Sequence, residues 1–260
     1  MDLIIPSWPA PTNIAAAITT RNGGCSTSPW NSLNLAFHVG DSPKSVEQNW
    51  QSVSEQLNLP SKLQLLNQVH GIEIVEVGDH KGIANEITPI ADGCYTKSAD
   101  YVCAVMTADC LPILFCNPAG TEVAAVHAGW RGLAAGVVSS AVKQFCSPAT
   151  DLMAYLGPAI SQQNFEVGPE VRQAFLSSSS HKHVQYKINT CFTQSDSEGE
   201  VSKNGRWMAD LYGLARVALY QAGVSQIYGG DFCSYADAER FYSYRRDGQT
   251  GRMASLIWIS

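Results

Sequence analysis

Apolar residues recur at helical spacing in four stretches of the chain. Residues 41–59 carry an apolar residue every three or four positions, with Pro43 in the first turn and Pro60 after the last. Gly223 follows the last of the four stretches, at the position where a helix commonly ends. The other three helices are predicted over 133–145, from 169 onward and over 210–222.

Short apolar runs between these helices predict strands. Strands outnumber helices in a mixed order, which favours an α+β fold with mixed sheets over a doubly wound parallel sheet. Near the end of the chain, 241–245 is predicted to pair with 253–259 as a hairpin. Residues 177–205 are polar, with four consecutive serines, and predict a mobile loop. The remaining strands are predicted at 63–66, 72–77, 101–106, 113–116, 121–126 and 153–156.

The composition allows a large packed core. The chain has 260 residues, of which 45% are hydrophobic and 15% charged, so we expect one domain over 1–260 or at most two fused halves. The net charge of -6 argues against a nucleic-acid partner, because such proteins need a basic field. An anionic substrate would need a local group of Arg or Lys side chains against this negative background.

The first residues do not resemble a targeting segment. Asp2 precedes the apolar residues, and Pro6 and Pro9 interrupt them. No stretch reaches membrane-spanning length without a Gly, Pro or polar break, so we expect a cytoplasmic protein with no membrane partner. In a reducing compartment its eight cysteines are buried apolar residues, metal ligands or nucleophiles. The lack of a C-x-x-C pair argues against a structural zinc knuckle.

Three potential metal ligands lie where predicted strands end or are interrupted. His70 and His127 follow strands, and Cys110 interrupts an apolar run. Such residues could meet at one sheet edge, and catalytic zinc needs three protein ligands and one open position. Each residue alone has a plainer interpretation, since a hydrogen-bonded core His and a buried Cys are both common.

The segment after His127, Ala-Gly-Trp-Arg-Gly, turns a strand into a helix. Exposed amides at such a helix start, with Arg131 beside them, form a natural anion site. A tight turn with Trp130 packed into the core is an equally good interpretation. Asp109 and Asp92 are candidates for a catalytic acid or base, and a turn residue and a cap are their plainer alternatives.

Several long motifs occur in one order along the chain. They are Asn-Gln-Val-His-Gly at 67–71, Ala-Asp-Gly-Cys-Tyr at 91–95, Thr-Ala-Asp-Cys-Leu-Pro at 107–112, Ala-Val-His-Ala-Gly-Trp-Arg-Gly at 125–132, Leu-Gly-Pro-Ala-Ile at 156–160 and Phe-Tyr-Ser-Tyr-Arg-Arg-Asp at 241–247. Together with Thr-Arg-Asn-Gly-Gly at 20–24 and Ser-Leu-Asn-Leu at 32–35, they resemble the YfiH/YlmD laccase-domain family from about residue 5 to the end of the chain.

This resemblance implies a four-layer α/β/β/α sandwich and a zinc site made of His70, Cys110 and His127. It also implies a purine nucleoside phosphorylase that acts on adenosine, inosine and methylthioadenosine with phosphate, together with adenosine deaminase activity. Members of the family have also been described as copper polyphenol oxidases, and enteric relatives as peptidoglycan-editing factors. No departure from the family pattern occurs at the three metal positions.

Further polar residues of the motif segments are expected to line a substrate pocket, although a surface hydrogen bond is the default interpretation of each. The remaining histidines carry weaker signals: His181 and His183 fall in the serine-rich segment, where a mobile loop would hold a metal poorly, and His38 and His80 have no partner pattern. The expected substrate-binding residues are Arg21, Asn34, Gln68, Asp92 and Arg245, and Arg246 belongs to the same motif as Arg245.

Three other activities compete with this interpretation. Two His and one Cys also suit Cu2+, with Met106 as a weak fourth ligand, although six His are too few for a multicopper cluster. A metal-free cysteine hydrolase would use Cys110 as nucleophile, His127 or His70 as base, and helix-start amides as an oxyanion hole. A non-catalytic binding module would need a fourth protein ligand, and no residue stands out for that role.

Overall fold

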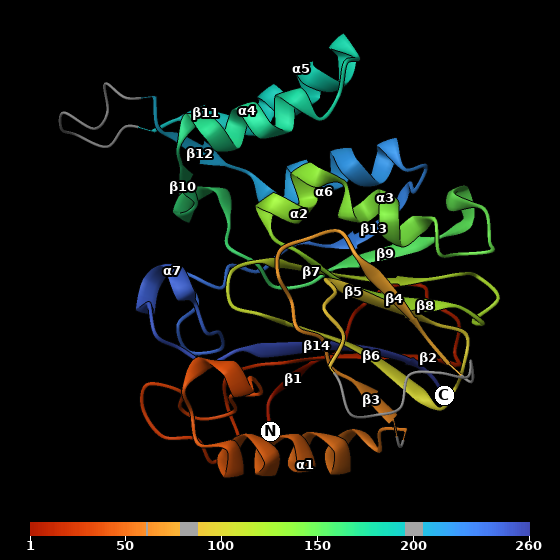
Figure 1. Ribbon diagram of the computed structural model, residues 1–260, viewed down its shortest axis with the longest axis vertical. Coiled ribbons are helices and arrows are strands. Elements are labelled where there is room, and N and C mark those ends of the chain that lie inside the picture. Colours follow the sequence, from red (N-terminus) through yellow and green to blue (C-terminus); the bar gives the residue numbers. More distant parts are fainter. Residues whose placement is uncertain (61, 79–87, 196–204) are drawn as a thin grey trace.

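The computed structural model describes residues 1–60, 62–78, 88–195 and 205–260, most of them in four layers. In Figure 1 a helical layer lies at the bottom, two stacked sheets lie above it, and a second helical layer covers the upper sheet. The expected α+β fold with a four-layer α/β/β/α sandwich is therefore confirmed. The layer helices are α1 (Pro43–Leu57) on one side and α2 (Trp130–Ala135), α3 (Val137–Val142) and α6 (Leu211–Gln221) on the other.

The sheet next to α1 has five strands in the order β1-β2-β14-β6-β3. Its strands pair antiparallel, except that β3 and β6 are parallel. Segments far apart in the sequence thus lie side by side, because β14 inserts between β2 and β6. The strands are β1 (Leu3–Ile4), β2 (Ile14–Thr19), β3 (Lys62–Gln64), β6 (Tyr101–Thr107) and β14 (Met253–Ile259).

The second sheet has six strands in the order β13-β9-β7-β8-β5-β4. β7 pairs antiparallel with both β8 and β9, and β5 pairs antiparallel with β8, whereas the outer pairs β13–β9 and β4–β5 are parallel. The sheet is therefore mixed, as expected. The strands are β4 (Ile74–Val77), β5 (Gly93–Thr96), β7 (Leu111–Cys116), β8 (Val123–Ala128), β9 (Met153–Leu156) and β13 (Gln226–Gly229).

Alternation along the central strands divides the interior into apolar layers. In β7, Ile113 and Phe115 face the helix layer, while Leu114 and Cys116 face the other sheet. A third layer lies between the five-stranded sheet and α1, where Trp50 packs among buried residues of β2, β6 and β14. Because β5, β7 and β8 are buried throughout, the residues at their ends have fixed positions.

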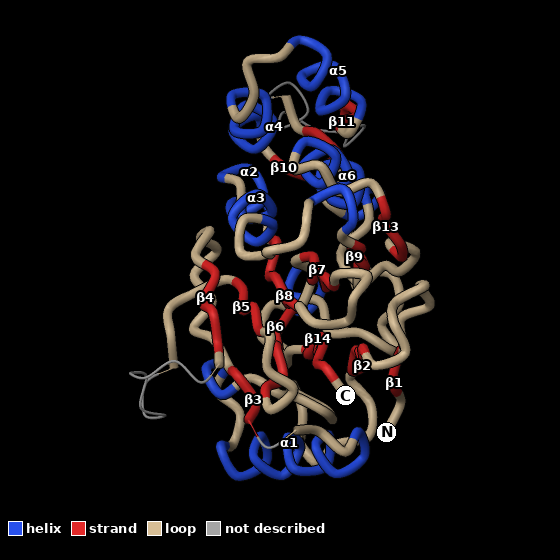
Figure 2. Tube along the Cα trace, turned by 90° about the vertical axis from the view of Figure 1, so that its right-hand side faces the viewer, coloured by secondary structure: helices blue, strands red, loops and turns tan. Residues whose placement is uncertain are grey.

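A further tier lies beyond the helix layer and is visible at the top of Figures 1 and 2. It combines two helices with a three-stranded antiparallel sheet in the order β10-β12-β11. The elements are α4 (Pro169–Ser177), α5 (Lys182–Thr190), β10 (Glu166–Val167), β11 (Phe192–Gln194) and β12 (Trp207–Ala209). Part of this tier falls in 177–205, so the predicted mobile loop is wrong there. Residues 196–204 of that prediction lie outside the described residues.

Two other predictions are wrong. Residues 241–245 do not form a hairpin strand, because β14 pairs with β2 and β6 instead. Tyr244–Asp247 forms the short helix α7. The Oγ of Ser243 caps its first turn by accepting from the N–H of Arg246 at 3.2 Å. The predicted helix over 133–145 is split into α2 and α3, because Gly136 adopts a φ of 102°, in the left-handed region that ends helices.

The remaining predicted elements are present with small shifts at their ends. The helix predicted over 210–222 is α6, and the carboxylate of Asp210 caps it by accepting from the N–H of Gly213 at 2.9 Å. The strand predicted at 153–156 coincides with β9. Among the described residues, no helix combines the length and apolar character needed to cross a membrane.

Candidate metal centre

Four strands of the six-stranded sheet bring polar side chains to one end of the sheet. β5 and β7 run antiparallel to β8, and β4 runs parallel to β5. Residues that precede β4, β5 and β7 therefore lie beside the last residues of β8. This topology places His70, Asp92, Cys110 and His127 together, as the sequence predicted for the two histidines and the cysteine.

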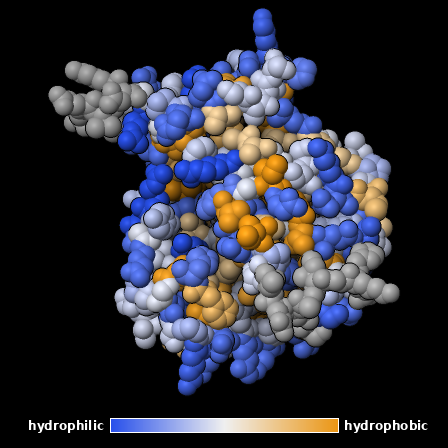
Figure 3. All heavy atoms as spheres, in the orientation of Figure 1, coloured by the Kyte–Doolittle hydropathy of each residue, from blue (hydrophilic) through white to orange (hydrophobic). Residues whose placement is uncertain are grey.

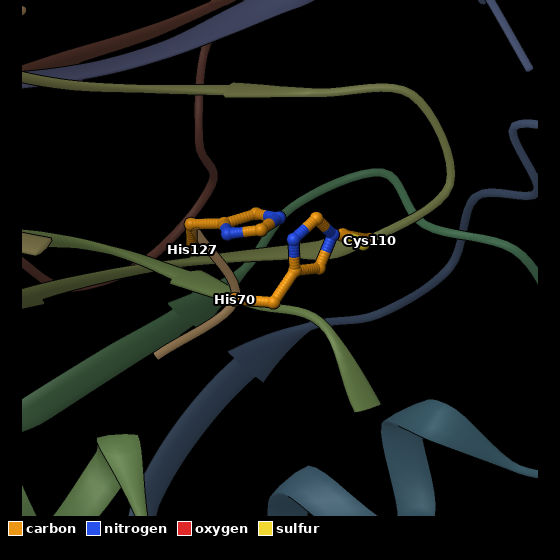
Figure 4. Close-up of side chains that lie close together, drawn as sticks. All are labelled: His70, Cys110 and His127. Carbon is orange, nitrogen blue, oxygen red and sulfur yellow. The ribbon is translucent and has the colours of Figure 1, made fainter. Parts of the chain in front are cut away.

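The side chains of His70, Cys110 and His127 point toward one another (Figure 4). Their ligand atoms, one ring nitrogen from each His and the Sγ of Cys110, all lie within 4.8 Å of one another. The two imidazole rings meet edge to face, with centroids 4.9 Å apart and an interplanar angle of 76°. Among the described residues, these three form the only His, Cys and carboxylate group with ligand atoms close enough to hold a metal ion.

Asp92 holds this arrangement from behind and exposes none of its surface. Its Oδ1 accepts from Nδ1 of His127 at 2.8 Å and from the N–H of His70 at 2.9 Å, and its Oδ2 accepts from the N–H groups of Gly71 at 2.6 Å and Val69 at 3.2 Å. The bond to Nδ1 leaves Nε2 of His127 as the ligand atom. The bonds to the loop hold His70 at a φ of 61°, which residues other than Gly seldom adopt.

Two glycines leave the space that the ligands need. A Cβ on Gly129 would lie 2.9 Å from both the Sγ of Cys110 and Cδ2 of His70. A Cβ on Gly132 would lie 2.6 Å from the backbone oxygen of Gly71, closer than such atoms approach without a shift. Two imidazoles and a thiolate are ligands that zinc and copper accept, so the donor set and this clearance fit a small metal ion.

The charges in the group couple Cys110 to His127. Burial raises the pKa of the Cys110 thiol, but the charge and hydrogen bonds of His127 and His70 outweigh it and lower this pKa to about 6. Burial lowers the pKa of His127, but the Cys110 thiolate and Asp92 raise it to about 9. For Asp92, burial raises the pKa and the bonds from His127 and Gly71 lower it, with a net decrease. Cys110 is thus a thiolate at neutral pH, the form that binds metals, and it pairs with a protonated His127. A metal that binds Nε2 of His127 would displace the proton there.

The group opens into a cavity of about 520 Å³, within the range of small-molecule sites. Three arginines line this cavity and give a chain of net charge -6 a local group of cations. Their guanidinium carbons lie over aromatic rings that also line it, which keeps the cations at the wall. The pairs are Arg131 over Trp130 at 4.4 Å, Arg245 over Phe165 at 5.4 Å and Arg252 over Tyr244 at 5.9 Å to the ring centroid.

Four of the other predicted site residues line the cavity: Gln68, Asp109, Arg131 and Arg245. The amide of Gln68 exchanges two bonds of 2.8 Å with the backbone of Met106, and so extends the strand pairing at the cavity wall. Arg131 is the second residue of α2, which has only six residues. Its guanidinium adds a full positive charge to the cavity wall, next to those of Arg245 and Arg252.

Asp109 lies between the metal centre and α7, at a φ of 96°. Its Oδ1 accepts from the Oγ of Ser234 at 2.7 Å, and its Oδ2 accepts from the N–H of Arg245 at 2.6 Å. Both oxygens therefore have protein donors, and the side chain fixes the start of α7. The geometry supports a positioning role for Asp109 toward Arg245.

Three of the predicted substrate-binding residues lie outside the cavity lining. Arg21 donates to the backbone oxygens of Asn31 at 3.2 Å and Ala238 at 3.1 Å. Asn34 is fully buried, and its Oδ1 accepts from the N–H of Arg252 at 3.0 Å. Asp92 acts behind the ligands, as described above. These contacts are structural. Asn34 and Asp92 contribute to the cavity only by holding the lining residues Arg252 and His127.

Other lining residues were not predicted. Phe165, Tyr244 and Arg252 line the cavity, as does His38, for which the sequence shows no partner pattern. Burial, and then the charge of Arg252, lower the pKa of His38, so this imidazole is neutral at pH 7. The motif at 241–247 was the available signal for Tyr244.

The histidines of the serine-rich segment have no metal partner in the described part of the chain. His181 caps the start of α5, and His183 lies in its first turn. His80 lies outside the described residues. Next to the metal centre, Val69 and Ile72 are exposed, and Figure 3 shows a hydrophobic cluster on the face where β4 and β5 lie. The surface beside the centre is therefore apolar at these two positions, whereas arginines line the cavity.

Known proteins resemble this chain over nearly its whole length. The sequence model of the family described as "Multi-copper polyphenol oxidoreductase laccase" matches residues 15–260. Purine nucleoside phosphorylase YfiH of Escherichia coli (strain K12) is 48% identical over 257 residues, which cover 99% of this chain and 98% of that protein. A purine nucleoside phosphorylase of Haemophilus influenzae is 42% identical over 259 residues, which cover 100% of both.

Solved structures agree with these relatives. Neisseria meningitidis protein NMB0706 has a TM-score of 0.88 and 45% identity, with 100% of both chains covered. YlmD from Geobacillus stearothermophilus has a TM-score of 0.80 and 32% identity, with 95% of this chain and 92% of that chain covered. Similarity of this extent in both sequence and backbone covers every element that forms the metal centre.

Proposed function

The chain belongs to the YfiH/YlmD laccase-domain family, and on that premise we propose that it is a zinc-dependent purine nucleoside phosphorylase. The proposed substrates are adenosine, inosine and methylthioadenosine with phosphate, and the proposed second activity is deamination of adenosine. One observation carries this proposal: a group of two His and one Cys opens into a cavity that has both arginines and aromatic rings along its wall.

Each half of a nucleoside and phosphate pair has matching residues in the cavity. Guanidinium groups bind phosphate through paired, charge-assisted hydrogen bonds, which is the role we assign to Arg131 and Arg245. A purine is flat and apolar on its faces, so Trp130 and Phe165 suit it by stacking. A bound zinc ion would supply a Lewis acid at neutral pH, held by His70, Cys110 and His127.

In phosphorolysis the bond between C1′ of the ribose and the base breaks, and a phosphate oxygen bonds to C1′. The chain's task is to hold phosphate beside C1′ and to keep the two reactants in line. Arg245 is fixed for this purpose at its backbone by Asp109 and at its side chain, where Nη1 donates to the backbone oxygen of Glu166 at 2.9 Å. Its remaining N–H groups are available to an anion.

The test is to incubate zinc-loaded protein with adenosine, with and without phosphate, and to measure adenine and inosine. We expect adenine only with phosphate and inosine under both conditions. If neither adenine nor inosine forms, the proposal is contradicted and a muropeptide substrate is favoured. An intense blue colour with one copper per chain would favour the polyphenol oxidase, and alkylation of Cys110 at an unchanged rate after zinc addition would favour the cysteine hydrolase.

A matched pair of variants separates the phosphate site from general damage. Arg131→Ala removes a cavity cation and is expected to raise the KM for phosphate about 10-fold or more, the loss typical of a charge-assisted bond. Arg21→Ala removes an arginine that lies outside the cavity lining and should leave this KM unchanged. Equal KM values for the two variants would contradict the assignment of Arg131.

A further inference from the structure

The end of the six-stranded sheet opposite the metal centre carries a second pair of reactive side chains. Lys97 directly follows β5, and Cys146 lies in the connection after α3. Nζ of Lys97 lies 3.2 Å from Sγ of Cys146, although the two residues are 49 positions apart. Both residues are exposed. An amine and a thiol thus meet at the surface, outside the cavity lining of the metal centre.

A buried carboxylate fixes the thiol side of this pair. The N–H of Cys146 donates to Oε1 of Glu122 at 2.7 Å, and the Oγ of Ser147 donates to Oε2 at 2.6 Å. Glu122 is 4% exposed and receives a third bond of 2.6 Å from the hydroxyl of Tyr95. The backbone of Cys146 is therefore held in place, and only the two short side-chain ends need to move.

The amine side is fixed as well. Thr96 ends β5, and its Oγ1 donates to the backbone oxygen of Val77 at 2.7 Å while accepting from the N–H of Ser98 at 3.0 Å. Lys97 lies between these anchored residues, with its Nζ 5.8 Å from the ring centre of Tyr95. Two anchored backbones thus keep the amine and the thiol together.

Cys25 provides a comparison within the same chain, because it is the other exposed cysteine among the described residues. Its Sγ donates toward oxygen atoms, the carbonyl of Ser45 at 3.5 Å and Oε1 of Gln48 at 3.4 Å. Within the described residues, the Cys25 thiol therefore has only oxygen atoms as partners, whereas the Cys146 thiol lies beside the amine of Lys97. Both cysteines are exposed, but only Cys146 has a cationic partner, Lys97.

We propose that Lys97 and Cys146 form a reversible covalent cross-link, a sulfenamide between Nζ and Sγ, when the protein meets hydrogen peroxide. In the first step the thiolate attacks one peroxide oxygen, the O–O bond breaks, and Cys146 becomes a sulfenic acid. The hydroxide that leaves takes a proton from the ammonium group of Lys97 and becomes water, which leaves the amine neutral. In the second step the neutral amine attacks sulfur, the S–O bond breaks, and a second water leaves with a proton from nitrogen. Sulfur loses two electrons, and one peroxide gains them.

The first step prepares the second. Hydrogen bonding to Cys146, and then its negative charge, raise the pKa of Lys97 in the reduced protein. Conversion of the thiolate to a neutral sulfenic acid removes both causes, so the amine loses its proton more readily when its target has formed. A thiol such as dithiothreitol attacks the sulfur of the S–N bond, releases the amine and restores the thiol after a second exchange.

The test is peptide mapping of the full chain after mild peroxide treatment. We expect a linked species that joins the peptides of Lys97 and Cys146, lighter than their sum by two hydrogens and absent after dithiothreitol. Cross-linking should also raise the Tm, because it closes a 49-residue segment in the unfolded chain. Oxygen-containing forms of Cys146 without a linked peptide, or a linked peptide that retains an oxygen atom, would overturn the proposal.

Two variants make the test specific. Lys97→Arg keeps a cation beside the thiol but replaces the nucleophilic amine with a guanidinium that stays protonated. A probe for sulfenic acids should therefore still label Cys146 in this variant, and the linked peptide should be absent. Cys25→Ser should form the link to the wild-type extent. Linkage in Lys97→Arg, or its loss in Cys25→Ser, would contradict the assignment.

Discussion

The two ends of the six-stranded sheet each bury a carboxylate and use it differently. Asp92 at one end and Glu122 at the other are 0% and 4% exposed. Burial raises the pKa of each, but hydrogen-bond donors outweigh it and hold both values low. Two backbone N–H groups and the side chains of Tyr95, Asn117 and Ser147 surround Glu122, whereas one donor to Asp92 is an imidazole.

This difference separates a structural carboxylate from a functional one. The side chains that donate to Glu122 use their polar atoms within the network, so the network stabilises the fold and fixes the backbone of Cys146. His127 gives Nδ1 to Asp92 and keeps Nε2 for the group that it forms with His70 and Cys110. A buried carboxylate therefore indicates a functional site when the side chain that donates to it has a second atom free to bind a ligand, as His127 has in Nε2.

The largest effect is expected from Gly129→Ala at the metal-centre end. The added Cβ would meet both Cys110 and His70 at 2.9 Å, so it would displace two ligands at once. We expect zinc affinity to fall by more than about 100-fold, beyond the usual effect of changes around the ligands. Titration against a competing chelator measures the affinity, and circular dichroism shows whether the fold is retained.

Gly78→Ala is the matched control for this change. Among the described residues, no atom lies within 4 Å of a Cβ at Gly78, and this glycine follows β4. We expect wild-type zinc affinity in this variant. If Gly129→Ala also bound zinc normally, the ligand group described here would not be the metal site, and the contrast between the two ends of the sheet would fail.

A smaller effect at the same end is expected from Asp92→Asn. An amide has the shape of the carboxylate, but its NH₂ group would face an N–H donor and its oxygen would lack the negative charge. Zinc affinity should therefore fall about 10- to 100-fold, as is typical for partners of metal-binding histidines. The control is Glu122→Gln, the same carboxylate-to-amide change at the other end. Equal affinities in the two variants would contradict the positioning role of Asp92.

The sequence was most informative where local signals act. The apolar runs at 101–106, 113–116 and 153–156 became buried strands, because a continuous apolar segment has few other stable positions. His70, Cys110 and His127 stood out because reactive side chains follow or interrupt such runs. They come together because of strand direction. In an antiparallel pair, the residue before one strand lies beside the last residues of its neighbour, as Cys110 before β7 lies beside His127 in β8.

Long-range packing determined what the sequence did not reveal. Arg252 and Phe165 reach the cavity from distant parts of the chain, and no local pattern marks either. The sequence did not predict the buried hydrogen-bond network of Glu122, because its partners Tyr95 and Ser147 are 27 and 25 positions away. The segment after Ser178 appeared too polar for regular structure, yet it forms α5 because Ile188 is buried against the helix layer.

At the opposite end, Glu122→Gln should reduce stability and leave the metal centre unchanged. The amide loses several charge-assisted bonds, and we expect a loss of about 3 kcal/mol in the free energy of unfolding at pH 7. The pKa of Glu122 is lowered on folding, so its contribution is complete above the unfolded value of about 4.3 and is lost as pH falls through the folded value. Urea unfolding at several pH values should show the two proteins converging below about pH 4.3.

The smallest effect is expected from Tyr95→Phe, which removes one donor from this network and keeps the ring. The ring should retain its edge contact with Phe145, at 5.0 Å between centroids, while Oε1 of Glu122 keeps the N–H of Cys146. We expect a loss of about 1.5 kcal/mol, the value of one bond to a charged group. Because that bond also helps to lower the pKa of Glu122, the acid-dependent loss of stability should end at a higher pH and be smaller than in the wild type. An unchanged acid limb would show that the hydroxyl adds nothing to the carboxylate, and a weaker zinc affinity would show that the two ends of the sheet are coupled rather than independent.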